Sequence, residues 1–325
     1  MPANTHLAHV SDVLLVWAVA AYAFAMLGYA AEFAFGRRSA ALPNRLRGAR
    51  LAGRVAVAVT VGGWLAHVGS VATRGFAAHR VPWGNMYEFS SMAALVAVTV
   101  YLVLLTRQPV RFLGAFVMAP VVLYLGLAGT VLYAKAGPLV PALNSYWIKI
   151  HVVAAITASG AFLVSGVVTV LYLLKDRWER RSMPSLGPGA AAAVEVGSPP
   201  TEAVPAEAIS RNTRGLMPWL PPAETLDRLA YKVIAFAFPV WTFAVIAGAI
   251  WAEQAWSRYW GWDPKETWSF ITWLAYAAYL HARATAGWRG RRAAVLSLVG
   301  VGCLLVDYYV VNTVITGLHS YAGVS

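Results

Sequence analysis

The residues of this chain whose types and spacing could do chemistry are concentrated in the segment 251–268. Five tryptophans lie there: Trp251, Trp256, Trp260, Trp262 and Trp268. Tryptophan favours the membrane–water interface, and such an aromatic belt explains Trp251 well. It explains Trp256, Trp260 and Trp262 less well, because they stand in a short connection between apolar runs. Trp260 and Trp262 project to one side of an extended segment, and a row of such rings suits a flat aromatic ligand.

The sequence DPKE at 263–266 predicts a helix start directly after these rings. Asp263 suits the cap, Pro264 the first position, and Glu266 an acidic version of the capping box. For the two acids, this structural role is the plain interpretation. A helix N-terminus also offers N–H groups and positive dipole to an anion, with Lys265 and Arg258 nearby. The segment therefore fits a planar molecule that carries carboxylates, and haem is such a molecule.

Haem iron accepts imidazole as an axial ligand, and the chain contains seven histidines. His151, in NSYWIKIHV, and His319, in GLHSYAG, are expected at the same membrane face as the tryptophans. These two are therefore the leading candidates. His281 lies 17 residues beyond Pro264, which is about 25 Å along a helix. It is expected near the opposite face, apart from the first site.

The remaining histidines are weaker candidates. His67 lies inside a predicted span, where a polar residue has a function or makes a helix–helix hydrogen bond. His79 lies in an external loop and has a plain interpretation as a surface residue. His6 and His9 are expected to face water.

Membrane helices must position these residues. The chain is 59% hydrophobic and only 12% charged, whereas a soluble domain carries about twice that charged fraction. Recurrent long apolar runs predict an all-α integral membrane protein. The single cysteine, Cys303, excludes an internal disulfide or a cysteine-based metal site, and nothing resembles a nucleic-acid-binding module. Eight spans are predicted, at 13–35, 55–74, 87–105, 112–132, 148–174, 230–251, 265–284 and 292–310.

Basic residues predict which way the spans face. The segments that would lie on one side, namely 36–54, 106–111, 175–232 and 283–292, hold 20 of the 26 Lys and Arg residues. The positive-inside tendency places this side in the cytoplasm. Both termini and the tryptophan segment are then external.

One stretch interrupts the apolar pattern. Residues 182–223 are rich in Pro, Ala, Gly and Ser and cannot bury enough apolar surface to fold. The sequence thus predicts a first membrane region at 1–174 with five spans and a largely disordered cytoplasmic linker at 175–229. A second membrane region at 230–325 holds three spans and an external C-terminal segment.

Together these motifs resemble the CcsA/ResC family of cytochrome c biogenesis proteins, which handle haem in the system II pathway. WSRYWGWDPKETWSFITWLAYAAYLHAR is similar to the family's WWD segment and the membrane histidine that follows it. NSYWIKIHV and GLHSYAG resemble its external-histidine segments, and PWGNMYEF resembles a further family stretch. The similarity covers about residues 60–325 outside the linker. Ala252 and Ser257 depart from the pattern, since glycine is expected at both positions.

The resemblance implies roles for single residues. His151 and His319 would be axial ligands of one external haem, and the segment 251–268, with Asp263, would hold the porphyrin. His281 would be one ligand of an internal haem site. His67, His79 and Lys265 are weaker candidates for haem contact. The cofactor would be haem b, as transported ligand and substrate, and a CcsB/ResB-type membrane partner would supply the opposite membrane histidine.

The implied reaction attaches haem vinyl groups to the two thiols of a Cys-X-X-Cys-His segment in an exported apocytochrome c. The chain would be a subunit of a holocytochrome c synthase, in which the haem carries the reactivity. No nucleophile or general base is evident from the sequence. Cys303 cannot act alone as a thiol reductant, so thiol reduction would take place elsewhere.

Two other functions remain open from the sequence. One is haem delivery without synthase activity, as in the smaller WWD proteins of the system I pathway. The other is a membrane transporter that binds no haem and has an ordinary aromatic belt. A haem absorption band in the purified protein would distinguish the transporter from the other two.

Overall fold

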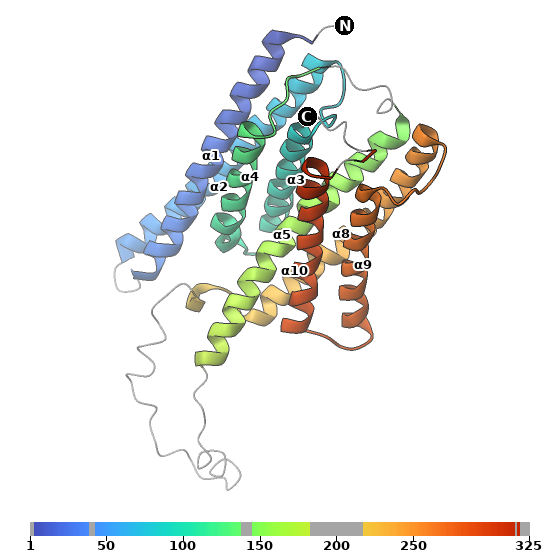
Figure 1. Cartoon of the computed structure of the whole chain (residues 1–325). Helices are drawn as coiled ribbons and strands as arrows, with labels where there is room; N and C mark the ends of the chain where they lie inside the picture. The colour runs from blue at the N-terminus through green and yellow to red at the C-terminus, as the bar shows by residue number, and fades with distance from the viewer. Residues whose placement is uncertain (1–2, 39–42, 138–144, 183–216, 316, 319–325) are drawn as a thin grey trace.

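The computed structural model describes residues 3–38, 43–137, 145–182, 217–315 and 317–318. In this part of the chain the regular structure is entirely helical, as predicted (Figure 1). The long helices are α1 (Thr5–Arg38), α2 (Pro43–Ala78), α3 (Met86–Arg107), α4 (Gly114–Thr130), α5 (Tyr146–Ser182), α8 (Ala223–Trp256), α9 (Pro264–Ala284) and α10 (Arg291–Leu305). Short turns are η1 (Arg111–Leu113), η3 (Met217–Trp219), η4 (Val306–Val310) and α11 (Val311–Thr313).

Seven candidate membrane spans, among the described residues, are long and apolar enough to cross a bilayer. Of the long helices only α9 is missing from this set. Its 21 residues would still reach about 31 Å, close to the thickness of a hydrocarbon core. It runs antiparallel to α10, and Figure 1 places the beginning of α1 and the end of α11 toward the same end of the bundle. The length and position of α9 therefore agree with the eighth membrane crossing that the sequence predicts.

Several helices extend past their apolar runs. Helix α1 begins at Thr5, so His6 and His9 lie in its first turns, where both are exposed as expected. Helix α5 continues to Ser182, and α8 begins at Ala223. Both therefore enter the stretch assigned from sequence to the linker 175–229, because ion pairs such as Lys175–Glu179 continue the helix into water. The predicted linker between 183 and 216 lies outside the described residues.

Helix α5 is the centre of the bundle. In the most apolar 18-residue window of α5, 78% is buried inside the bundle. This share is larger than in any other candidate span of the described chain. Figure 1 shows it crossing between the α1–α4 group and the α8–α10 group. Small residues allow this, since a Cβ at Gly160 would lie 3.0 Å from the carbonyl oxygen of Ala93 in α3. The first turns of α5, which carry His151, are thus held between both groups.

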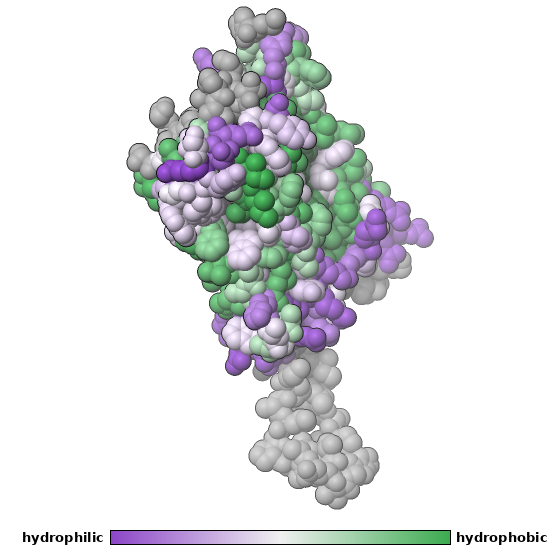
Figure 2. Space-filling view, turned by 90° about the vertical axis from the view of Figure 1, so that its right-hand side faces the viewer, coloured by the Kyte–Doolittle hydropathy of each residue, from purple (hydrophilic) through white to green (hydrophobic). Residues whose placement is uncertain are grey.

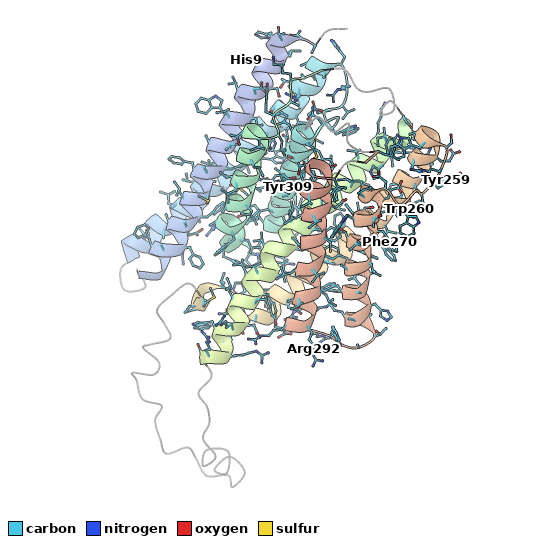
Figure 3. All side chains as sticks on the ribbon, in the orientation of Figure 1. His9, Tyr259, Trp260, Phe270, Arg292 and Tyr309 are labelled. Carbon is cyan, nitrogen blue, oxygen red and sulfur yellow. The ribbon has the colours of Figure 1, made fainter. Side chains whose placement is uncertain are left out.

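The two ends of the bundle differ in chemistry. On the face shown in Figure 2, hydrophobic residues cover the middle and more hydrophilic residues lie toward the ends. Figure 3 places Tyr259 and Trp260 near the upper end and Arg292 at the lower end. At that lower end Arg283 binds Asp227 through two hydrogen bonds of 2.8 and 2.9 Å. This pair joins α9 to α8 at the end opposite the tryptophan segment.

Candidate functional site

A pocket opens at the upper end of the bundle between α3, α5, α8, α9 and the last turns of α10. Its empty space, including its open mouth, is about 1190 Å³. Six of the residues singled out from the sequence line it, and they are His151, Trp251, Trp256, Trp260, Lys265 and Glu266. His151 and Trp256, which are 105 positions apart in the chain, thus meet at one cavity.

His151 is half-buried in the wall of this pocket. Its Nδ1 lies 2.7 Å from the carbonyl oxygen of Ala244 in α8. A carbonyl only accepts hydrogen bonds, so Nδ1 carries the proton and Nε2 carries the lone pair that a metal would need. The ring lies directly on α8, because a Cβ at Gly248 would be 2.7 Å from Nδ1. Gly248 therefore provides the space that this ring occupies.

Trp251 and Trp256 form the α8 part of the wall. Trp251 is only 2% exposed. Its ring meets that of Trp256 edge to face, with centroids 4.8 Å apart. Both rings belong to an apolar cluster with Ile148 and Val152 of α5. This packing fixes the position of the two indoles beside His151.

Trp260 and Trp262 differ from the predicted arrangement. Trp260 lines the pocket, whereas Trp262 is 68% exposed and lies outside its wall. Their rings meet at right angles, with centroids 5.7 Å apart. The alternation argument assumed an extended chain, but Trp262 has φ 57°, in the left-handed region. Phe270 contacts both rings, and Figure 3 shows it beside Trp260 at the edge of the bundle.

The predicted cap of α9 is present. The Asp263 side chain accepts a hydrogen bond from Lys265 N at 3.2 Å, and Glu266 Oε2 accepts from Asp263 N at 3.1 Å. Asp263 has a second contact that the cap does not require. Its Oδ1 accepts a hydrogen bond from Leu318 N at 2.7 Å. The chain directly before His319 is thereby bound to the start of α9, while His319 itself lies outside the described residues.

The first turn of α9 also brings charge into the pocket. Lys265 Nζ donates to the carbonyl oxygen of Asp307 at 2.9 Å and lies 3.8 Å from its carboxylate. Asp307 and Tyr308 belong to η4, a π-helical turn at the end of α10. Such turns recur at functional sites because they redirect side chains out of the helix pattern. Here the turn places Asp307 and Tyr308 in the pocket wall.

The other candidates lie outside the pocket wall. His281 is exposed near the end of α9, 17 residues after Pro264, or about 25 Å along the helix. His79 is exposed at the end of α2, with φ 51°. His67 is fully buried between Tyr22 OH at 3.3 Å and Ser91 Oγ at 2.9 Å. These contacts favour its interpretation as a helix–helix hydrogen bond. Trp268 is half-buried on α9.

Comparisons with known proteins show which protein family the sequence matches. The cytochrome c assembly protein family matches residues 83–319. Three similar relatives carry the name cytochrome c biogenesis protein CcsA. That of Synechococcus elongatus is 38% identical, over 74% of this chain and 78% of the relative. That of Gloeobacter violaceus is 37% identical, over 80% and 84%, and that of Porphyra purpurea is 35% identical, over 78% and 82%.

The chain belongs to the cytochrome c assembly protein family. This confirms the resemblance drawn from the motifs and makes the chain a multi-pass membrane protein of cytochrome c maturation. The family match begins at Trp83 and ends at His319, so it leaves out α1 and α2. Among solved structures, the cytochrome c heme lyase CcmF has a similar fold, with TM-score 0.59 and 17% identity. The similarity covers 95% of this chain and about half, 47%, of that one.

Two positions that shape this pocket were not singled out from the sequence. Gly248 is one, although a glycine three residues before Trp251 on a helix marks a place of close approach. Glu88 is the other. Its side chain accepts hydrogen bonds from Arg74 and Arg80 and, at 2.8 Å, from Gly84 N. This network anchors the segment 83–86 that lines the pocket. The acid in PWGNMYEF and the two arginines before it were its only sequence signal.

Proposed function

We propose that, within cytochrome c maturation, this chain is the haem-handling subunit of a cytochrome c synthase. It carries haem across the membrane and presents it in the pocket at the external face. There the haem vinyl groups are joined to the thiols of a Cys-X-X-Cys-His segment in apocytochrome c. The observation that carries this proposal is one imidazole held by a backbone carbonyl in a pocket lined by five tryptophans, namely Trp83, Trp241, Trp251, Trp256 and Trp260.

The residues of the pocket fit haem. His151 presents Nε2 as a ligand atom because Nδ1 is bound to Ala244. Trp251, Trp256 and Trp260 supply aromatic surface for the porphyrin. His319 is proposed as the second axial ligand, and the hydrogen bond from Leu318 to Asp263 supports it, since it binds the adjacent chain to the same helix start. When bound, haem supplies the vinyl groups and the iron.

His281 belongs in this proposal to a second haem site at the entry side. Helix α9 is continuous from Pro264 to Ala284, so about 25 Å separates His281 from the pocket. One histidine does not complete a six-coordinate iron, so the opposite ligand comes from a CcsB/ResB-type partner. Cys303 lies on α10 outside the pocket wall, so a separate component keeps the thiols reduced.

Reconstitution tests the proposal. The chain is co-expressed with its CcsB/ResB-type partner and an exported apocytochrome c in a host without its own maturation system. We expect a Soret band in the purified complex and covalent haem in the cytochrome. Changing His151→Gly should lower the haem content, and added imidazole should restore part of it by filling the open position. His6→Ala, in the exposed start of α1, is the matched control and should behave as wild type.

The other outcomes separate the alternatives. A wild-type complex without a Soret band and without covalent product overturns the proposal in favour of a transporter. Bound haem with product only when a separate haem chaperone is added would indicate a delivery protein. His281→Ala, purified with the partner, should lack haem at both sites. Full haem in the external pocket of that variant, in cells that supply haem only from the cytoplasm, would remove His281 from the entry route.

A further inference from the structure

Glu266 contributes more to the pocket than a helix cap requires. Its Oε2 accepts hydrogen bonds from Gly261 N at 2.8 Å and Asp263 N at 3.1 Å, which completes the cap of α9. The residue is only 9% exposed and lines the pocket. Its second oxygen, Oε1, is buried and has no hydrogen-bond partner among the described residues. The two backbone donors fix the carboxylate, so this acceptor is held in place.

A buried acceptor without a donor has a free-energy cost, and native proteins seldom keep one without a use. The cap itself does not explain it, because Oε2 alone makes both bonds and glutamine would serve equally well. Glu266 therefore keeps one carboxylate oxygen without a hydrogen bond at the wall of an aromatic pocket.

The other titratable groups of the pocket wall are already engaged. Lys265 is paired with Asp307, and Tyr308 OH donates to the carbonyl oxygen of Met86 at 2.9 Å. His151 Nδ1 is bound to Ala244. Asp263, next to Glu266 at the start of α9, bonds to Lys265 N and Leu318 N. Tyr259, at the rim, is 62% exposed. Within the described pocket wall, Glu266 Oε1 is thus a carboxylate oxygen that has no hydrogen bond and belongs to no ion pair, whereas Asp307 Oδ1 lies 3.8 Å from Lys265 Nζ.

We propose that Glu266 is the general base that removes the proton from the apocytochrome cysteine as it adds to the haem vinyl group. This inference rests on the proposed function. Glu266 Oε1 accepts the thiol proton, and the sulfur forms a bond to the α-carbon of the vinyl group. A proton from water adds to the β-carbon, and Glu266 gives its proton to the hydroxide that remains, which restores both the carboxylate and the water. One S–H has then added across one C=C bond, and no electron is gained or lost.

The chemistry requires such a group. The thiolate is the reactive form of cysteine, and an ordinary thiol, with a pKa of about 8.5, is mostly protonated at neutral pH. A positioned general base typically contributes about 10²–10⁴-fold to a rate. Glu266 supplies a proton acceptor in the first turn of α9, within the segment 251–268 that the sequence predicts as the binding segment.

The Glu266→Gln variant tests this role, because glutamine keeps the size and the cap. In the reconstituted complex, its haem content and thermal stability should match wild type. Its rate of thioether formation should fall about 10²–10⁴-fold at neutral pH. The deficit should shrink as the pH rises toward about 9–10, because the substrate thiol then ionises without help. The rate of the variant should therefore rise more steeply with pH than the wild-type rate, because only the variant depends on unassisted ionisation of the thiol.

Glu253→Gln is the matched control, since Glu253 lies in the last turns of α8 outside the pocket wall. It should keep the wild-type rate and pH profile. A Glu266→Gln rate equal to wild type across the pH range overturns the inference and leaves the proposed function standing. A loss of haem in this variant with an unchanged rate per bound haem also overturns it, in favour of a positioning role. Wild-type protein without haem or product would instead refute the proposed function itself.

Discussion

Asp263 Oδ1 accepts a hydrogen bond from the backbone N–H of Leu318 at 2.7 Å, across 55 positions of the chain. The fit is close, because a Cβ at Gly317 would lie 2.7 Å from the same oxygen. One carboxylate therefore caps α9 and binds the segment that precedes His319. This gives Asp263 a role in the geometry of the site that a cap alone would not have.

We expect Asp263→Ser to separate these two roles. Serine is a good N-cap and should preserve the helix start, whereas Asp263→Ala should cost about 0.5–2 kcal/mol of stability. The single short hydroxyl of serine cannot reach both Lys265 N and Leu318 N. The serine variant should thus remain folded but retain less haem, as measured by the ratio of Soret absorbance to protein. Normal haem content in the serine variant would show that the link to Leu318 is dispensable.

Gly248→Ala should displace His151. The new methyl group would lie 2.7 Å from Nδ1 and 2.8 Å from Cε1, so the ring must leave the carbonyl oxygen of Ala244. Loss of such an outer partner typically lowers metal affinity about 10–100-fold. Titration of the purified complex with haem measures this loss, and added imidazole should reverse part of it.

Gly302→Ala is the control for this variant. Gly302 lies on α10 with no atom within 4 Å of its added Cβ. The change should leave haem affinity unaltered and should stabilise the helix by up to about 1 kcal/mol. Equal haem affinity in the two alanine variants would contradict the role of Gly248.

Trp260 and Trp262 should respond differently to truncation. Trp260 lines the pocket, whereas the Trp262 side chain is 68% exposed. Loss of one aromatic contact of about 1 kcal/mol lowers affinity about fivefold. Trp260→Ala should therefore weaken haem binding by about this factor, and Trp262→Ala should change it less. Haem titration at matched amounts of membrane-inserted protein measures this difference. If the two tryptophans only anchored the protein in lipid, both variants would lose inserted protein and haem to the same extent.

The orientation of the bundle is tested by labelling. The excess of Lys and Arg predicts a cytoplasmic linker and an external tryptophan segment. In a Cys303→Ser background, a cysteine at Ser198 should resist a membrane-impermeant thiol reagent in intact cells. A cysteine at Tyr259, which is 62% exposed, should react. The reverse pattern would invert the topology.

The sequence predicted the meeting of His151, Trp256 and Trp260 because long apolar runs fix which segments share a membrane face. It also predicted the cap at Asp263, since capping depends on local residue types. The position of Trp262 could not be predicted, because its left-handed backbone is imposed by neighbouring contacts rather than by its own preference. Likewise, one extra residue in the turn at η4 leaves the apolar pattern of α10 unchanged, so the placement of Asp307 was not visible.

The hydrogen bond from Tyr308 to Met86 has a consequence for how the protein is made. It joins residues 222 positions apart, and Tyr308 lies in the turn that closes the pocket. During synthesis, α3 enters the membrane long before α10. The pocket residues of α3 are therefore present before those of η4 have been made. Contacts this distant in sequence also form slowly. A ribosome-bound chain that stops before α10 therefore has no completed pocket, and the pocket forms only when nearly the whole polypeptide has entered the bilayer.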